Sequence, residues 1–428
     1  MKIKTVPMSY DDVTAIPPEK HQKPKRVNLF LRVLLKLVSL PDLLAVRFRC
    51  KRIGMEKLGK REPCLILMNH SSFVDLEIAA SVLFPRAFNI VATTDGFVGK
   101  RWLMRQIGCI PTKKFVSEMG LIRDITYAIN TQKSSVLMYP EASYSFDGTA
   151  TPLPDSLGKF VKHLGVPVVL IRTYGAFSRD PLYNNLQRRK VKVSADLEYF
   201  LSPEDVSRMS ADEINTALGE RFCFDGFRWQ QENRVRIDEP FRADFLNRVL
   251  YKCPSCLAEG EMEGKGIRLT CKACGKVHEL DPYGFLVSPD GDADFSHVPD
   301  WYAWERACVR RELEDGTYRM EVPVDICMSV DTKRIFRVGE GVLLHDTSGF
   351  HLTGCDGKLD YRHSPLSSYS LYSDFNWYEI GDVICIGNHA ALYYCFPKTD
   401  RDVVAKARLA AEELYKLAKS ASRTSRVK

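Results

Sequence analysis

The 428-residue sequence lacks several features that would place it in a special class. It has no apolar run of the ~20 residues that a helix needs to cross a hydrocarbon core, no internal repeat and no low-complexity tract. With 45% hydrophobic and 27% charged residues, it is neither a multi-span membrane protein nor a disordered chain. No secretory leader pattern is visible, so we expect a cytoplasmic protein. The length predicts two or three domains.

Excess positive charge is absent from the body of the chain. The net charge is +7, but residues 1–62 carry +9, residues 63–415 carry −7, and the last 13 residues carry +5. A neutral-to-acidic body is not typical of a protein that wraps nucleic acid. The distribution predicts that the ends contact an anionic membrane surface.

Nine of the 13 cysteines show no paired spacing. This cysteine usage is typical of proteins in a reducing compartment. The other four form two C-x-x-C knuckles separated by 14 residues: Cys253, Cys256, Cys271 and Cys274. Four thiolates at this spacing predict a structural Zn²⁺ site in a zinc ribbon, with disulfides as the alternative that the compartment disfavours. The nearby His278 is unnecessary as a ligand, and we predict that it lies on the surface.

Residues 28–40 form a short amphipathic stretch before Pro41. Its polar residues recur at steps of four, four and three, and so share one helical stripe: Asn28, Arg32, Lys36 and Ser39. About 13 residues are too few to span a membrane. We predict a monotopic helix in the membrane interface, with a helix packed on the protein's own core as the alternative.

Short apolar runs alternate with amphipathic ones between residues 63 and 171. The predicted strands are 63–68, 87–92, 135–139 and 167–171. The predicted helices are 75–84, 99–107, 118–131 and 156–164. This alternation predicts an α/β domain with a mostly parallel sheet covered by helices. Residues 200–250 are helical in pattern and should pack back on this sheet.

Beyond residue 310, short aromatic and β-branched runs alternate with turn signals, and an amphipathic helix over 402–419 follows. The pattern predicts a small β-barrel closed by the helix and resembles a pleckstrin-homology-like fold. The predicted domains are a basic, membrane-associating segment (1–50), an α/β domain (51–245), the zinc ribbon (246–285) and the β-rich domain (286–428).

His70 and Asp75 have the spacing of a general base and its orienting carboxylate. His351 and Asp356 have the same spacing, but they lie in a hairpin-like segment with no expected cleft. His70 instead follows a buried apolar run and precedes a helix. It therefore lies at the carboxyl end of a sheet strand, where open α/β sheets bind ligands. Glu141 follows a second strand and should reach the same edge.

Four ordered blocks of the sequence resemble the glycerolipid acyltransferases, and most closely the bacterial 1-acyl-glycerol-3-phosphate acyltransferases. They are Asn69 to Asp75, Gly108 to Lys114, Tyr139 to Ser145 and Gly165 to Ile171, within a resemblance that spans residues 28–240. The order and spacing of four blocks are more specific than any one of them.

The resemblance implies that His70 removes the proton of an acceptor hydroxyl and that Asp75 orients the imidazole. The hydroxyl attacks a fatty-acyl thioester, with acyl-CoA or acyl-carrier protein as co-substrate and a lipid as acceptor. The acceptor site would use residues of the second and third blocks: Lys113, Lys114, Glu141, Ser143 and Tyr144. The chain departs from the family where Tyr144 replaces the arginine that grips the acceptor phosphate, and where Lys114 replaces another arginine.

Two other functions stay open at this stage. A catalytically idle adaptor could use the amphipathic helix, the ribbon and the β-rich domain to bind membrane and partners. Nucleic-acid binding by the zinc ribbon is disfavoured, because the acidic residues between positions 253 and 282 offset the charge of the lysines there.

Overall fold

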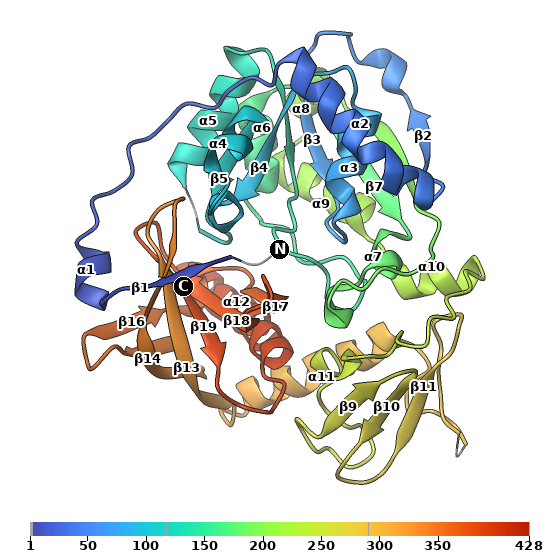
Figure 1. Cartoon of the computed structure of the whole chain (residues 1–428), viewed down its shortest axis with the longest axis vertical. Coiled ribbons are helices and arrows are strands. Elements are labelled where there is room, and N and C mark those ends of the chain that lie inside the picture. Colours follow the sequence, from blue (N-terminus) through green and yellow to red (C-terminus); the bar gives the residue numbers. More distant parts are fainter. Residues whose placement is uncertain (1–2, 117, 290, 428) are drawn as a thin grey trace.

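The computed structural model describes residues 3–116, 118–289 and 291–427. Its described strands form three sheets: one of seven strands near the N-terminal half, one of four strands around the cysteines, and one of eight strands toward the C-terminus. Figure 1 shows the seven-stranded sheet above the other two, with the long helix α11 (Val298–Glu314) running between the lower sheets.

The seven-stranded sheet has the order β2-β8-β7-β3-β6-β4-β5. All of its neighbours pair in parallel except β7 and β8, which are antiparallel, so the sheet is mixed and mostly parallel. Its strands are β2 (Arg49–Ile53), β3 (Leu65–Met68), β4 (Phe88–Thr93), β5 (Cys109–Thr112), β6 (Ser135–Met138), β7 (Val168–Tyr174) and β8 (Ser194–Leu201).

The central strand β3 is apolar throughout because both of its faces are covered. Ile66 and Met68 pack in one core with Ile78, whereas Leu65 and Leu67 pack in another with Leu218. The helices that flank the sheet are α3 (Val74–Val82), α4 (Arg101–Gln106), α5 (Met119–Asn130), α6 (Leu157–Leu164), α7 (Ala176–Arg179), α8 (Pro203–Arg208), α9 (Ala211–Phe222) and α10 (Gly226–Glu232).

The second sheet is antiparallel and small, with the order β12-β11-β10-β9. It consists of β9 (Met262–Lys265), β10 (Arg268–Cys271), β11 (Val277–Leu280) and β12 (Leu286–Val287). The sequence pattern did not predict α11, which follows this sheet. Trp301 of α11 is fully buried and donates its indole N–H to the carbonyl oxygen of Lys252 at 2.9 Å, which joins the helix to the cysteine region.

The third sheet is mainly antiparallel and has the order β16-β15-β14-β13-β19-β18-β17. Seven of its eight strands are β13 (Arg319–Ser329), β14 (Ile335–Asp346), β15 (Gly349–Gly354), β16 (Leu359–His363), β17 (Tyr372–Trp377), β18 (Gly381–Gly387) and β19 (Leu392–Pro397), which α12 (Val404–Val427) follows; the eighth is β1 (Thr5–Pro7). Among the described strands, β16 and β17 do not pair, so the strands do not form a complete hydrogen-bonded ring. The apolar side of α12, with buried Ala407, Ala410 and Leu414, packs into this sheet's core, as predicted for the closing helix.

The N-terminal 50 residues contact two different parts of the molecule. Strand β1 (Thr5–Pro7) pairs in parallel with β14, and helix α1 (Tyr10–Thr14) lies beside the same sheet (Figure 1). Helix α2 (Leu29–Ala45) packs on α3 instead. The predicted end of this helix at Pro41 is wrong, because the helix continues to Ala45 and buries Leu43 in the core beneath it.

Candidate active site and cysteine cluster

His70 and Asp75 lie together at the carboxyl end of β3. The imidazole Nδ1 is 3.1 Å from Asp75 Oδ2, and the two side chains are 21% and 1% exposed. The backbone N–H groups of Ser71 and Ser72 also donate to Asp75 Oδ2, at 2.8 and 3.1 Å. The contact with Asp75 holds the proton of the imidazole on Nδ1 and leaves Nε2 as the basic nitrogen.

Two tyrosine rings cover the faces of the His70 imidazole. The ring centroids of Tyr139 and Tyr144 lie 4.0 and 4.2 Å from that of His70, with interplanar angles of 25° and 28°. Stacking on both faces restricts the plane of the imidazole. Because Asp75 engages Nδ1, Nε2 is the ring nitrogen that could meet a reacting group.

The electrostatic surroundings of His70 favour its neutral form. Burial lowers the pKa of His70 below 6.5, the hydrogen bond and charge of Asp75 raise it, and the charge of Lys114 lowers it. A neutral imidazole at pH 7 is able to accept a proton, as a general base must.

Glu141 connects two loops at the site. Its Oε2 accepts the backbone N–H of His70 and its Oε1 accepts that of Thr151, both at 2.9 Å. Burial raises the pKa of Glu141 to about 7, although both hydrogen bonds lower it. With both oxygens used, the carboxylate holds the His70 backbone in place.

The other predicted acceptor-site residues contact the C-terminal sheet region. The Lys113 ammonium donates to the carbonyl oxygen of His389, and the Lys114 ammonium lies 4.1 Å from the ring centroid of Tyr372. Burial lowers the pKa of Lys114, against the charges of Asp374 and Asp95. Their role as acceptor ligands stays a prediction.

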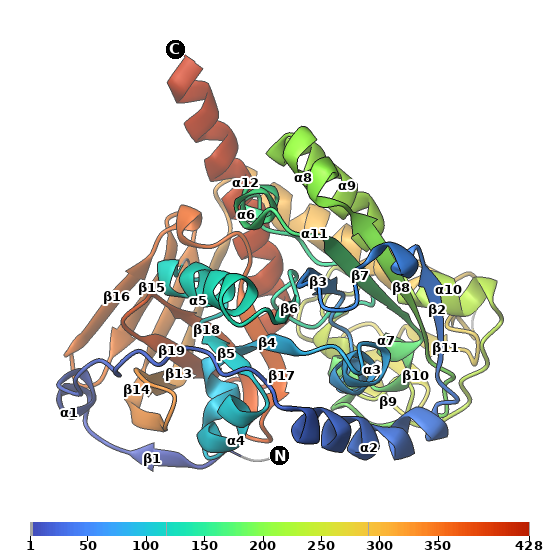
Figure 2. The ribbon, with the colours of Figure 1, turned by 90° about the horizontal axis from the view of Figure 1, so that it is seen from above.

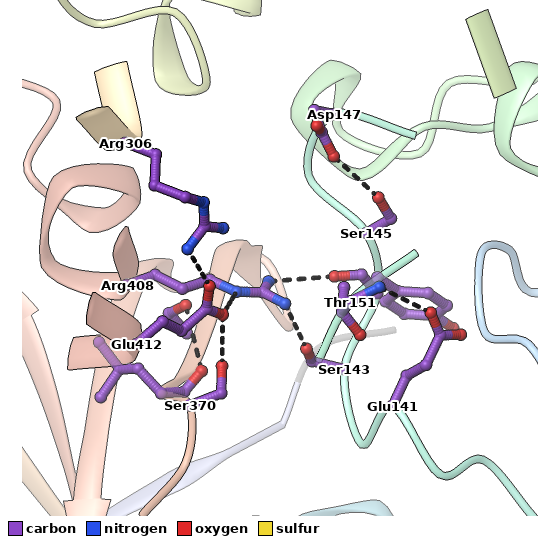
Figure 3. A network of polar contacts seen from close by, with 12 residues as sticks. Glu141, Ser143, Ser145, Asp147, Thr151, Arg306, Ser370, Arg408 and Glu412 are labelled. Atoms are coloured by element: carbon purple, nitrogen blue, oxygen red, sulfur yellow. Dashed lines mark hydrogen bonds and ion pairs between the residues drawn. The ribbon is translucent and has the colours of Figure 1, made fainter. Parts of the chain in front are cut away.

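Sequence reasoning missed a polar network that reaches the site from α11 and α12. Arg408 of α12 donates from Nη2 to Ser143 Oγ at 2.9 Å and from Nη1 to the Tyr144 carbonyl oxygen at 3.1 Å (Figure 3). Arg408 and Ser143 are 265 residues apart in the chain, so no local pattern in the sequence could have indicated their contact.

The four predicted cysteine ligands form one cluster, in which all sulfur atoms lie within 4.8 Å of one another. Cys253 Sγ is 3.7 Å from Cys274 Sγ, and Cys256 Sγ is 3.7 Å from Cys271 Sγ. A disulfide requires ~2.05 Å, whereas a tetrahedral Zn²⁺ site with Zn–S bonds of ~2.3 Å places its sulfurs ~3.8 Å apart. The donor set and its spacing therefore fit a metal ion.

The two knuckles share one backbone geometry. The N–H of Leu257 donates to the Cys253 carbonyl oxygen at 2.9 Å, and that of Gly275 donates to the Cys271 carbonyl oxygen at 2.8 Å. Both donors have a positive φ, of 64° and 78°. Each knuckle thus turns sharply after its second cysteine, which brings both of its sulfurs to one side.

The prediction that His278 lies on the surface is wrong. Its side chain is fully buried, with its ring 4.9 Å from that of Trp301 in an edge-to-face contact. The helix α11 covers it, and α11 was not predicted.

Part of the chain matches a known protein family. Residues 49–173, which include His70, Asp75 and Glu141, match the Acyltransferase family model. This segment of the chain is therefore similar to the Acyltransferase family, and the predicted resemblance to acyltransferases is confirmed for it. Among solved structures, the 1-acyl-sn-glycerophosphate (LPA) acyltransferase PlsC from Thermotoga maritima is similar, with 14% identity, a TM-score of 0.37, and coverage of 45% of this chain and 77% of that one. No curated protein matches the chain.

Glu141→Gln should loosen the backbone around His70, because a carboxamide has one acceptor oxygen for two backbone donors. Leaving a buried N–H unpaired costs about 1–3 kcal/mol, equivalent to ~5- to 150-fold faster amide exchange. Hydrogen exchange of His70 and Thr151, followed by mass spectrometry, measures this. Glu220→Gln, at an exposed position of α9, is the control. Unchanged protection of both amides would contradict the role of Glu141 in holding the two backbone segments.

Proposed function

We propose that the protein transfers a fatty acyl group from an acyl thioester, either acyl-CoA or acyl-carrier protein, to the hydroxyl of a lysophospholipid or another lipid-like alcohol. The observation that carries this proposal is the His70–Asp75 pair within the segment that matches the Acyltransferase family, in which Asp75 engages Nδ1 and not Nε2.

His70 acts as general base in the proposed reaction. Nε2 takes the hydroxyl proton as the acceptor oxygen attacks the thioester carbonyl, and Asp75 stabilises the imidazolium. Collapse of the tetrahedral intermediate breaks the C–S bond, and the sulfur leaves with the proton that His70 returns. The products are an ester and a free thiol, and no acyl-enzyme forms.

The acceptor is proposed only as a class. For Lys113 and Lys114 to hold an acceptor phosphate, their ammonium groups would have to leave His389 and Tyr372. Ser143 and Tyr144 remain proposed acceptor contacts through their hydroxyls. The four cysteines are proposed to hold a structural Zn²⁺, because all four donors are thiol sulfurs and no position is left for a substrate.

The orientation of α2 supports attachment to a membrane surface. Its polar stripe faces the protein: Arg32 donates to the carbonyl oxygen of Pro85, Lys36 lies 4.4 Å from the Phe84 ring centroid, and Ser39 is buried. Its apolar side is exposed, most strongly at Leu29, Phe30, Leu37, Val38 and Leu44. None of the described helices is long and apolar enough to span a bilayer.

Both basic ends of the chain were predicted to contact an anionic membrane surface, but Arg32 and Lys36 of α2 contact the protein. Figure 2 shows the last described turns of α12 extending from the side of the molecule opposite α2. A flat membrane that meets α2 would not meet these turns, so the membrane proposal concerns α2 alone.

The second candidate function is a catalytically idle, membrane-bound adaptor. The contact of Arg408 with the Ser143 hydroxyl favours it, because that hydroxyl is one of the proposed acceptor contacts.

His70→Ala should lower thiol release by about 10²–10⁴-fold, the usual contribution of a general base. The assay follows thiol release from acyl-CoA and acyl-carrier protein over a panel of lysophospholipids and other lipid alcohols. His351→Ala, which removes a histidine 2.8 Å from Asp360 in the C-terminal sheet, is the matched control. Equal turnover of wild type and His70→Ala would overturn the base assignment, and no release with any pair would favour the adaptor.

The activity of the wild type should depend on pH with an acid limb below pH 6.5. His70 must be neutral to accept a proton, and its folded pKa lies below 6.5, so activity is lost as the pH falls through that pKa. An acid limb centred above pH 6.5 would contradict the assignment.

One equivalent of zinc should copurify with the chain, and Cys256→Ser should lower the zinc content well below that. Metal analysis by mass spectrometry measures both. Cys223→Ser, an exposed cysteine outside the cluster, should leave the zinc content unchanged. Equal zinc in the two variants would exclude the cluster as the metal site.

Replacing Phe30 and Val38 of α2 by aspartate should weaken binding to phosphatidylglycerol vesicles at least ~10-fold, since a buried large apolar side chain contributes ~1.5–3 kcal/mol. Cosedimentation measures the binding. Val287→Asp, at an exposed apolar position of β12, is the control. Unchanged cosedimentation of the α2 variant would favour the alternative, a helix without a membrane role.

A further inference from the structure

Arg408 lies on α12, but its side chain contacts a loop of the α/β domain. Its guanidinium points into the loop after β6, where it contacts Ser143 Oγ and the Tyr144 carbonyl oxygen (Figure 3). The side chain is 4% exposed, and its guanidinium carbon lies 4.4 Å from the ring centroid of Phe146 in the same loop. The loop that follows β6 is therefore held from α12.

The guanidinium is itself held by Glu412, which two other residues fix in place. Glu412, one turn further along α12, accepts from Arg408 Nε at 3.3 Å. Glu412 also accepts from Ser370 Oγ at 2.6 Å and contacts Arg306 Nη1 of α11 at 2.7 Å. Because Glu412 is 1% exposed, this arrangement is protected from water. The position of Arg408 thus depends on contacts among α11, α12 and the segment before β17.

The loop contact reaches the proposed general base through one residue. Arg408 binds the carbonyl oxygen of Tyr144, and the ring of Tyr144 stacks on the imidazole of His70 at 4.2 Å. If the backbone of residue 144 moved, the ring would leave one face of His70 open to water.

We propose that Arg408 is a positioning residue of the acyltransferase site: it holds the loop so that Tyr144 stays on His70 and keeps that imidazole in one plane. This inference rests on the proposed function. It makes α12 and its supporting contacts a part of the active centre, although they lie outside the Acyltransferase-family segment.

A direct role for Arg408 in binding an acceptor phosphate fits the contacts less well. Its Nε, Nη1 and Nη2 each donate to a protein oxygen, and a phosphate would have to displace the loop. The carboxylate of Glu412 at 3.3 Å would also repel an anion. Arg408 therefore does not simply replace the arginine missing from position 144.

The pKa of His70 should respond to the loss of Tyr144 from its face. The groups that face His70 are Asp75 of α3, Tyr139 and Glu141 after β6, Tyr144 and, by its charge, Lys114. Burial is the largest cause that lowers the pKa of His70. Release of Tyr144 admits water, so the pKa should rise toward 6.5.

The test is the titration of His70 in the full chain labelled with ¹³C at histidine Cε1, with the signal assigned by His70→Gln. Arg408→Gln should raise the pKa of His70 and lower kcat by about tenfold to hundredfold with little change in KM for the acyl thioester. Arg310→Gln is the control, because Arg310 contacts Glu413 of α12 but not the loop. An unchanged His70 titration in folded Arg408→Gln overturns the proposal.

Two further variants keep the test decisive if Arg408→Gln does not fold. Ser143→Ala removes one acceptor of Arg408, and Tyr144→Leu removes the stacked ring; each should raise the pKa of His70. Combining Ser143→Ala with Tyr144→Leu should add nothing to Tyr144→Leu alone. Additive shifts would overturn the proposal. Turnover by His70→Ala that equals wild type would refute the general base, and the titration distinguishes that failure from loss of the positioning role.

Discussion

Burial of β3 on both faces is the constraint on which the rest of the site depends. A strand that packs against helices on each side carries no polar side chain until it leaves the sheet, so its first polar groups appear together at its carboxyl end. Asn69 Oδ1 accepts the backbone N–H of Thr173 at 2.8 Å, which ties this end of β3 to β7. His70 follows, and α3 then brings Asp75 back to it.

The site is enclosed by parts of the chain that are far apart in sequence. Glu141 holds the backbone of His70, Tyr139 and Tyr144 cover its ring, and Arg408 holds the loop from the other side. The two ends of the chain meet at the C-terminal sheet, where β1 pairs with β14 and α12 fills the core. The C-terminal region is thereby joined to the site by packed contacts and is not a loosely attached module.

Much of the α/β domain could be predicted because its signals are local. The four predicted strands and four predicted helices correspond to β3, β4, β6, β7 and to α3, α4, α5, α6, with ends shifted by a few residues. Three strands of the sheet were missed. Strands β2 and β8 have mixed burial and carry charged residues, and β5 has only four residues, one of them Pro111. Helix α11 was missed because tryptophan, tyrosine and valine in its sequence favour strands as readily as helices.

The sequence by itself determined which chemical groups lie close together along the chain: the His70–Asp75 pair, the glutamate after β6 and the four thiols. Only the tertiary structure decided how these groups are used. Short spacing constrains neighbours along a strand or turn, whereas contacts such as Arg408 with Ser143 depend on how whole elements pack. Periodicity likewise defines a face of a helix but not what that face contacts. The apolar side of α2 points outward because the helix packs on α3 through its other side.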